Sequence, residues 1–238
     1  MADTELNPYA PPRASTRPDL QPGELPPYRP TAGLSTALCW SLGLTSMFTA
    51  MSVVSSILQL SLLGRIEAGA HFTDAELGAN DLRVGLLALG FVLGHLTTMI
   101  LWCIWHARTH DNLRAVGAEQ LEFGRHAWGW FFCPLLNLWR PLQATRELWR
   151  SADPKSTQML EPKLFQLWWG TWITGNILFR LGSSLDEDNP EISEMITSTQ
   201  FDMLAYALLS LAGVFAILLI RETTRRSQKG HARLVKSA

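Results

Sequence analysis

The chain has 238 residues and a formal net charge of −1, which argues against the basic composition of a nucleic-acid-binding protein. Its hydrophobic residues, 47% of the total, are gathered into long runs, which argues against a soluble globular protein. Three cysteines, Cys39, Cys103 and Cys133, lack the spacing of a disulfide framework or a zinc site. We therefore expect no nucleic-acid partner, no metal and no cofactor.

The first segment, residues 1–33, is rich in proline and poor in apolar side chains, with short runs such as Pro26-Pro27. Proline fixes φ and cannot donate a backbone hydrogen bond, so this composition predicts a disordered or polyproline-like tail. A docking segment for a proline-binding partner is the alternative interpretation.

Four long apolar runs follow, at residues 34–63, 84–105, 164–182 and 201–220. The first two contain no charged residue, and the last two contain Arg180 and Asp202 near one end. A helix needs about 20 apolar residues to cross a hydrocarbon core of ~30 Å. The sequence therefore predicts an all-α integral membrane protein with four transmembrane helices, in a membrane domain over residues 34–220.

Small and polar residues mark the first two spans. Gly90 and Gly94 form a GxxxG pattern, which predicts close contact with a neighbouring helix or with another subunit. His95 is ionisable at mid-span, which makes it a candidate intramembrane polar site. The first span is rich in hydroxyl side chains that either pack against other helices or line a polar path, among them Ser41, Thr45, Ser46, Thr49, Ser52, Ser55 and Ser56.

Charged residues alternate between the segments that separate the spans. Lys and Arg are concentrated in residues 106–163 and 221–238, whereas residues 64–83 and 183–199 are mostly acidic. Basic segments are retained on the cytoplasmic side of the membrane. This pattern predicts a multi-pass protein with a cytoplasmic N-terminus and a basic cytoplasmic tail at residues 221–238.

Residues 127–139, which we call the tryptophan-rich segment, are apolar but too short to cross a membrane as a helix of about 20 Å. Pro134 interrupts the segment, and basic residues flank it on both sides. We predict a re-entrant or interfacial segment, with a kinked fifth crossing as the alternative. Pro141 then starts a predicted surface helix at residues 141–151, which lies either on the membrane or on the rest of the cytoplasmic segment.

Several short strings around this segment form a distinctive pattern. They are Asn112-Leu113-Arg114, Gly117-Ala118, Trp128-Gly129-Trp130-Phe131-Phe132, Asn137-Leu138-Trp139-Arg140-Pro141 and Glu147-Leu148-Trp149-Arg150. Over roughly residues 80–220 the chain resembles the bacterial integral-membrane family catalogued as domain of unknown function 4328. The resemblance implies a helical membrane architecture in the bacterial cytoplasmic membrane, and it transfers no catalytic residues.

The leading hypothesis is a non-enzymatic membrane module that binds a lipid or a membrane-protein partner on its cytoplasmic side. An amide and a guanidinium among tryptophans suit an anionic lipid phosphate. The candidate contact residues are Asn137, Trp139, Arg140, Arg146, Trp149 and Arg150.

Two other classes of function remain open. A small transporter or channel would use His95 and the hydroxyl groups of the first span. A membrane enzyme acting on lipid headgroups would use His106, His110 and His126, although no catalytic motif is present.

Overall fold

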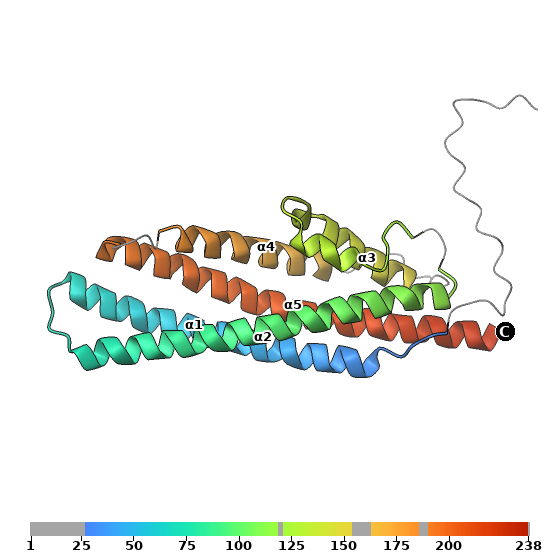
Figure 1. Cartoon of the computed structure of the whole chain (residues 1–238), viewed down its shortest axis with the longest axis horizontal. Coiled ribbons are helices and arrows are strands. Elements are labelled where there is room, and N and C mark those ends of the chain that lie inside the picture. Colours follow the sequence, from blue (N-terminus) through green and yellow to red (C-terminus); the bar gives the residue numbers. More distant parts are fainter. Residues whose placement is uncertain (1–26, 119–120, 154–162, 186–189, 238) are drawn as a thin grey trace, which may run out of the picture.

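The computed structural model describes residues 27–118, 121–153, 163–185 and 190–237 (Figure 1). These residues form helices and loops and contain no strand, so the predicted all-α class is confirmed. Residues 1–26, which make up most of the predicted proline-rich tail, lie outside the described part of the chain.

Four long helices form the body of the molecule, and three shorter elements connect α2 to α4. The long helices are α1 (Ala32–Glu67), α2 (Asp74–Ala115), α4 (Leu164–Ser183) and α5 (Ile192–Ser237). The connection contains two 3₁₀ turns, η1 (Ala127–Phe132) and η2 (Leu136–Leu138), followed by the helix α3 (Arg140–Ser151).

The long helices extend beyond the apolar runs, because polar residues at their ends also favour helix. The predicted loop 64–83 contains the first turns of α2, which begins at a capping box. The Thr73 hydroxyl accepts the Glu76 N–H at 3.2 Å, and the Glu76 carboxylate accepts the Thr73 N–H at 3.0 Å. Such a reciprocal pair satisfies amide groups that the first helical turn leaves unbonded.

The basic segment 221–238 continues α5 as a helix up to Ser237 instead of forming a separate tail. Gly230 allows this continuation to pack closely, since a Cβ there would collide with the carbonyl oxygen of Ala152. Arg233 forms a 2.9 Å ion pair with the buried Asp153.

Among the described residues, three helices are long and apolar enough to cross a membrane: α1, α2 and α5. The sequence predicts four spans. The fourth candidate, α4, has 20 residues but is less apolar, because it contains Gln166, Asn176 and Arg180 beside several tryptophans. Length and composition therefore identify three candidate membrane helices rather than four.

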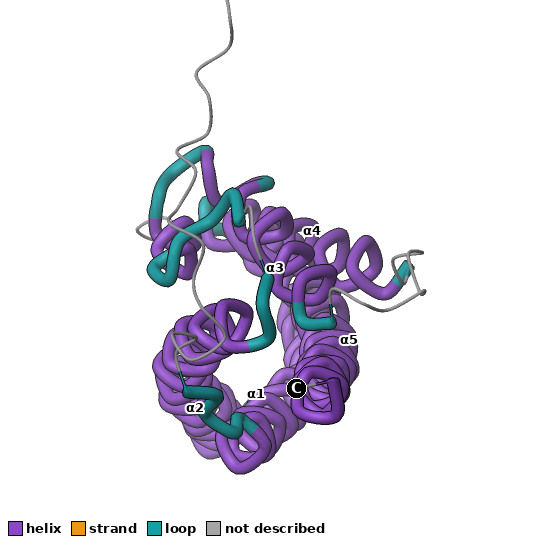
Figure 2. The backbone as a smooth tube through the Cα atoms, turned by 90° about the vertical axis from the view of Figure 1, so that its right-hand side faces the viewer, coloured by secondary structure: helices purple, strands orange, loops and turns teal. Residues whose placement is uncertain are grey.

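The four long helices run antiparallel along one axis and form an open arc in the order α2, α1, α5, α4 (Figures 1 and 2). The α1–α2 and α4–α5 connections lie at one end, which we call the loop end. Helix α2 finishes at the other end, where α1 begins and α5 terminates; we call it the tail end. The segment η1–α3 contacts α2, α4 and α5 toward the tail end and partly covers the open side of the arc.

Small residues let the helices approach closely. Gly90 faces Phe48 of α1, and a Cβ at Gly94 would lie 2.8 Å from the Thr45 hydroxyl. The close contact with a neighbouring helix that the GxxxG pattern predicts is therefore made with α1 of the same chain. On the other side of α1, the Ser210 hydroxyl of α5 donates to the Ser46 carbonyl at 3.1 Å.

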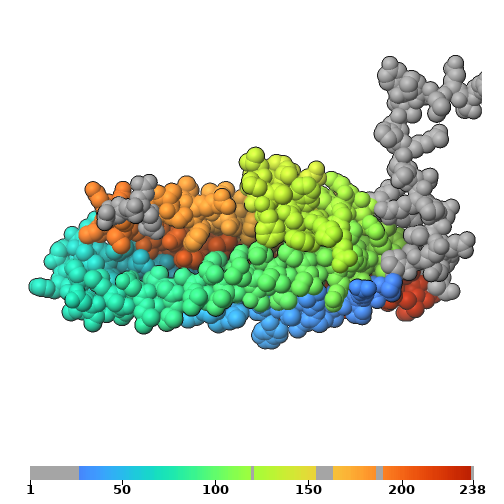
Figure 3. Space-filling model, in the orientation of Figure 1, coloured from blue at the N-terminus to red at the C-terminus, as the bar shows by residue number. Residues whose placement is uncertain are grey.

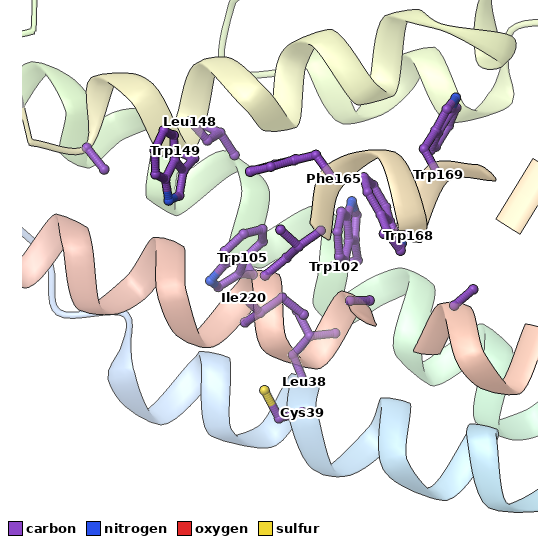
Figure 4. Close-up of a cluster of buried hydrophobic side chains, with 14 of the residues drawn as sticks. Leu38, Cys39, Trp102, Trp105, Leu148, Trp149, Phe165, Trp168, Trp169 and Ile220 are labelled. Atoms are coloured by element: carbon purple, nitrogen blue, oxygen red, sulfur yellow. The ribbon is translucent and has the colours of Figure 1, made fainter. Parts of the chain in front are cut away.

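The hydrophobic core is centred near the tail end and contains several aromatic side chains (Figure 4). Trp105 and Ile220 lie between α2 and α5, while Phe165 and Trp168 enter from the start of α4. This core joins the short elements to the long helices and fixes the position of the tryptophan-rich segment.

Candidate functional site: a groove between α2 and α4

Phe131 of the tryptophan-rich segment is held among tryptophans of α2 and α4. Its ring lies edge-on to Trp102 at 5.8 Å, to Trp169 at 6.1 Å and to Trp172 at 6.0 Å between ring centroids. Edge-to-face pairs at such distances are favourable beyond simple area burial. The Trp169 indole N–H also donates to the Leu138 carbonyl at 2.8 Å, which fixes the end of the segment.

Three of these rings, those of Phe131, Trp102 and Trp172, belong to the floor of a groove of about 370 Å³ on the open side of the arc. In Figure 3 the groove runs between α4, in orange, and α2, in green, and ends against the yellow-green segment. The floor is made of Trp102, Phe131, Phe132, Trp168 and Trp172, and residues of all four long helices form the walls.

Polar side chains lie in the groove beyond this floor. They are His95 and Thr98 of α2, Asn176 of α4, and Thr45, Ser46 and Thr49 of α1. Thr45 and Thr98 hydrogen-bond each other at 3.2 Å, and the Thr49 hydroxyl donates to the Ser46 carbonyl at 2.9 Å. Most of the hydroxyl groups thus serve helix packing, while His95 lines the groove and is exposed.

One donor in the floor has no partner among the described residues. The Nε1–H of Trp102 is buried and makes no hydrogen bond. The Asn176 side-chain amide donates to the Trp172 carbonyl at 2.8 Å, and its second amide hydrogen is not required for that bond. Within the described part of the chain, the residues lining the groove include no Lys, Arg, Asp or Glu. The groove is therefore uncharged and offers hydrogen-bond donors.

The candidate contacts Asn137, in η2, and Trp139 and Arg140, at the start of α3, are not among the residues that line the groove. Arg140 is held in a 2.8 Å ion pair with Glu122, and its guanidinium lies 5.6 Å from the Phe123 ring centre. Trp139 is exposed and Asn137 is half-buried. Arg140 thus already has a carboxylate partner in the same chain.

The turn between η1 and η2 presents apolar side chains outward. Leu135 is 73% exposed and Phe132 is 53% exposed, and Leu138 and Trp139 continue the same surface. Leu135 adopts a positive φ of 65°, which favours glycine and is strained for leucine. An exposed apolar tip on a strained turn is costly in water, which suits a site of contact with apolar surroundings.

The remaining candidate contacts come from α3. Trp149 is buried in the core, where the Arg226 guanidinium lies 4.2 Å from its ring centre. Arg146 is half-buried and Arg150 is exposed. The apolar face of α3 packs on the protein, so the structure does not bring Trp149 to the surface that carries Trp139 and Arg140.

The three histidines of the enzyme hypothesis differ in their surroundings. His106, just past the second apolar run, and His110 are both buried, and the His110 ring bonds the Phe123 carbonyl at 2.8 Å. His126 is exposed beside Trp128. Burial, together with the neighbouring His110, lowers the pKa of His106 to about 3, so its ring is neutral at pH 7. The described residues contain no group of three or more His, Cys, Asp or Glu side chains that could hold a metal.

The contribution of α4 to the groove was not predicted from the sequence. Trp168, Trp172 and Asn176 are spaced four residues apart, which places them on one face of a helix. This spacing was a detectable signal, although it does not reveal which helix they would face.

The fold and the groove together define an all-helical protein with three candidate membrane helices and an uncharged, aromatic-floored groove. A family model described as domain of unknown function (DUF4328) matches residues 68–225. The chain therefore belongs to this family, as the resemblance predicted. The match includes α2, the tryptophan-rich segment and α4, while α1 precedes it. Searches of curated proteins and of solved structures each returned no match.

Proposed function

We propose that this protein is a non-enzymatic module of the bacterial cytoplasmic membrane that binds a lipid in the groove between α2 and α4. The first support is the outer surface of the long helices. Large apolar side chains are exposed along their predicted spans, such as Trp40 on α1, Leu86 and Ile100 on α2, Ile177 on α4 and Leu211 on α5. Surfaces of this extent are rare on soluble monomers and suit contact with lipid.

Helix α4 is proposed as the fourth crossing. It packs antiparallel along α5, which is one of the three candidate membrane helices. If α5 crosses the bilayer at residues 201–220, its neighbour α4 occupies the same depth. A close contact supports this depth: the carboxylate of Asp202, ten residues into α5, lies 2.8 Å from the Cβ position of Gly182 near the end of α4.

The tail end is proposed to face the cytoplasm. It gathers the basic residues of α3 and of the end of α5, including the Arg233–Asp153 and Arg225–Glu222 ion pairs. Lys and Arg beside membrane spans favour the cytoplasmic side. In this orientation the tryptophan-rich segment is interfacial and its apolar tip enters the cytoplasmic leaflet.

The groove is the observation that carries the proposed binding function. It opens between α2 and α4, at the depth of the apolar spans, so a molecule would enter it from the bilayer rather than from water. Its lining is apolar and aromatic, with a few polar groups, which is typical of small-molecule sites. The aromatic floor closes the groove toward the tail end, which favours a binding module over a transport path. A transporter remains the second candidate, because His95 and Thr49 line this groove.

The test uses the purified full-length protein in lipid nanodiscs that contain a phospholipid with a photoactivatable acyl chain. We expect cross-links on peptides of α2 and α4 that line the groove. Cys103→Phe should reduce this labelling at least about fivefold, because Cys103 lines the groove. The matched control is Ile104→Phe, since Ile104 is the next residue and is 44% exposed on the outer face. Equal labelling of the two variants on the groove peptides would contradict the proposal.

A further inference from the structure

We propose that the groove binds an isoprenoid quinone, with its ring at the level of His95 and Asn176. This inference rests on the proposed function, since the ligand must enter from the bilayer. It goes further by naming the ligand class, which it derives from the depth, charge and shape of the groove.

The depth of the polar groups argues against a phospholipid as the preferred ligand. His95 lies in the middle of the span 84–105 and is separated from Trp102 in the floor by seven residues, about 10 Å of helix. Asn176 lies one turn beyond Trp172, in the same direction away from the floor. Phospholipid carbonyl groups stay near the interface, where tryptophans also lie. A ligand that uses His95 and Asn176 therefore carries its polar group inside the hydrocarbon core.

The chemistry of the lining selects a neutral molecule with hydrogen-bond acceptors. Among the described residues no Lys, Arg, Asp or Glu lines the groove, so a fatty-acid carboxylate would lie there without a counter-ion from them. The available donors at this depth are an imidazole N–H of His95 and the second amide hydrogen of Asn176. Carbonyl oxygens of a quinone satisfy such donors without adding charge.

The shape of the groove suits a planar ring with an apolar tail. Aromatic rings of Phe91, Phe131 and Phe179 line it together with the floor tryptophans, and flat rings stack favourably on such walls. The open side between α2 and α4 is bordered by exposed apolar residues such as Ile100 and Ile177. An isoprenoid tail would leave through this opening into the surrounding lipid.

The experiment titrates the full-length protein in nanodiscs with a decyl-substituted benzoquinone and follows quenching of tryptophan fluorescence. We expect saturable quenching in the wild type. His95→Leu and Asn176→Leu should each raise the Kd at least about tenfold, because each removes a buried hydrogen bond. Thr97→Val is the control at similar depth: Thr97 is exposed, its hydroxyl donates to the Leu93 carbonyl at 2.9 Å, and its Kd should match the wild type.

A second measurement needs only the wild-type protein, so it holds even if a variant fails to fold. The same quinone should displace the photoactivatable phospholipid from the groove peptides of α2 and α4. Absence of saturable quenching and of displacement, with phospholipid labelling intact, would overturn the quinone and leave the proposed lipid-binding function standing. Loss of both quinone binding and groove labelling would overturn both.

Discussion

At the scale of single residues, two buried polar side chains near the end of α2 differ in whether they form hydrogen bonds. Asn112, 1% exposed, pairs with the backbone of Arg29 in both directions: its Oδ1 accepts the Arg29 N–H at 2.9 Å, and its Nδ2 donates to the Arg29 carbonyl at 2.7 Å. The first residue of the Asn-Leu-Arg string therefore holds the chain that leads into α1. His106, also 1% exposed, makes no hydrogen bond through either ring nitrogen within the described residues.

The burial of His106 predicts a loss of stability in acid. Its pKa is about 3 in the folded protein against an ordinary value of 6.5, so it contributes nothing to the pH dependence above pH 6.5, where both states are neutral. Between pH 6.5 and 3 only the unfolded chain binds this proton, and unfolding becomes easier by up to about 1.4 kcal/mol per pH unit. Thermal unfolding in detergent between pH 7.5 and 4.5 measures this loss.

The His106→Leu variant should show a flatter dependence of its unfolding temperature on pH than the wild type. The control is His126→Gln, which changes an exposed histidine at the same end of the molecule. An equally steep pH dependence in the wild type and in His106→Leu would contradict the role assigned to His106.

At the scale of elements, the tryptophan-rich segment is held in place by aromatic packing. A kinked fifth crossing does not fit its structure, because η1 has six residues and η2 has three, and a 3₁₀ turn rises only about 2.0 Å per residue. Its apolar side chains have two kinds of surroundings: Phe131 packs on the α2 and α4 tryptophans, whereas Leu135 is largely exposed.

Replacing Phe131 should detach this segment from the long helices. We expect Phe131→Ala to lower the free energy of unfolding by about 3 kcal/mol, near the lower end of the range for such truncations, because Phe131 is only partly buried. The control Phe132→Ala removes a neighbouring ring that is more than half exposed and should cost less than about 1 kcal/mol. Thermal unfolding in detergent, followed by near-UV circular dichroism of the tryptophans, measures both. Equal losses would show that Phe131 does not anchor the segment.

At the scale of the whole molecule, the open arc depends on which helix faces are already paired. Helix α1 packs on both α2 and α5, and α5 also packs on α4. The groove remains between α2 and α4 because the inserted segment η1–α3 covers only one end of that side. The arrangement places the α1–α2 and α4–α5 connections together at the loop end.

The proposed four crossings assign each connecting segment to a definite side of the membrane. Reporters inserted after residues 115, 155 and 230 should all be cytoplasmic, and a reporter after residue 70 should lie outside, because α4 returns the chain before α5. Accessibility of these reporters in intact cells measures their sides. If α4 did not cross, reporters 115 and 230 would lie on opposite sides of the membrane.

The sequence by itself determined the helical class, the positions of the apolar runs and the family, because hydrophobic runs and the tryptophan strings are local patterns. It also identified His95 as a candidate intramembrane polar site. Only the tertiary structure decided that Gly90 and Gly94 face α1, that Trp149 is buried, and that Phe131 joins α2 to α4. The physical reason is that helix periodicity shows which residues share a face, whereas the partner of that face depends on packing between segments distant in sequence.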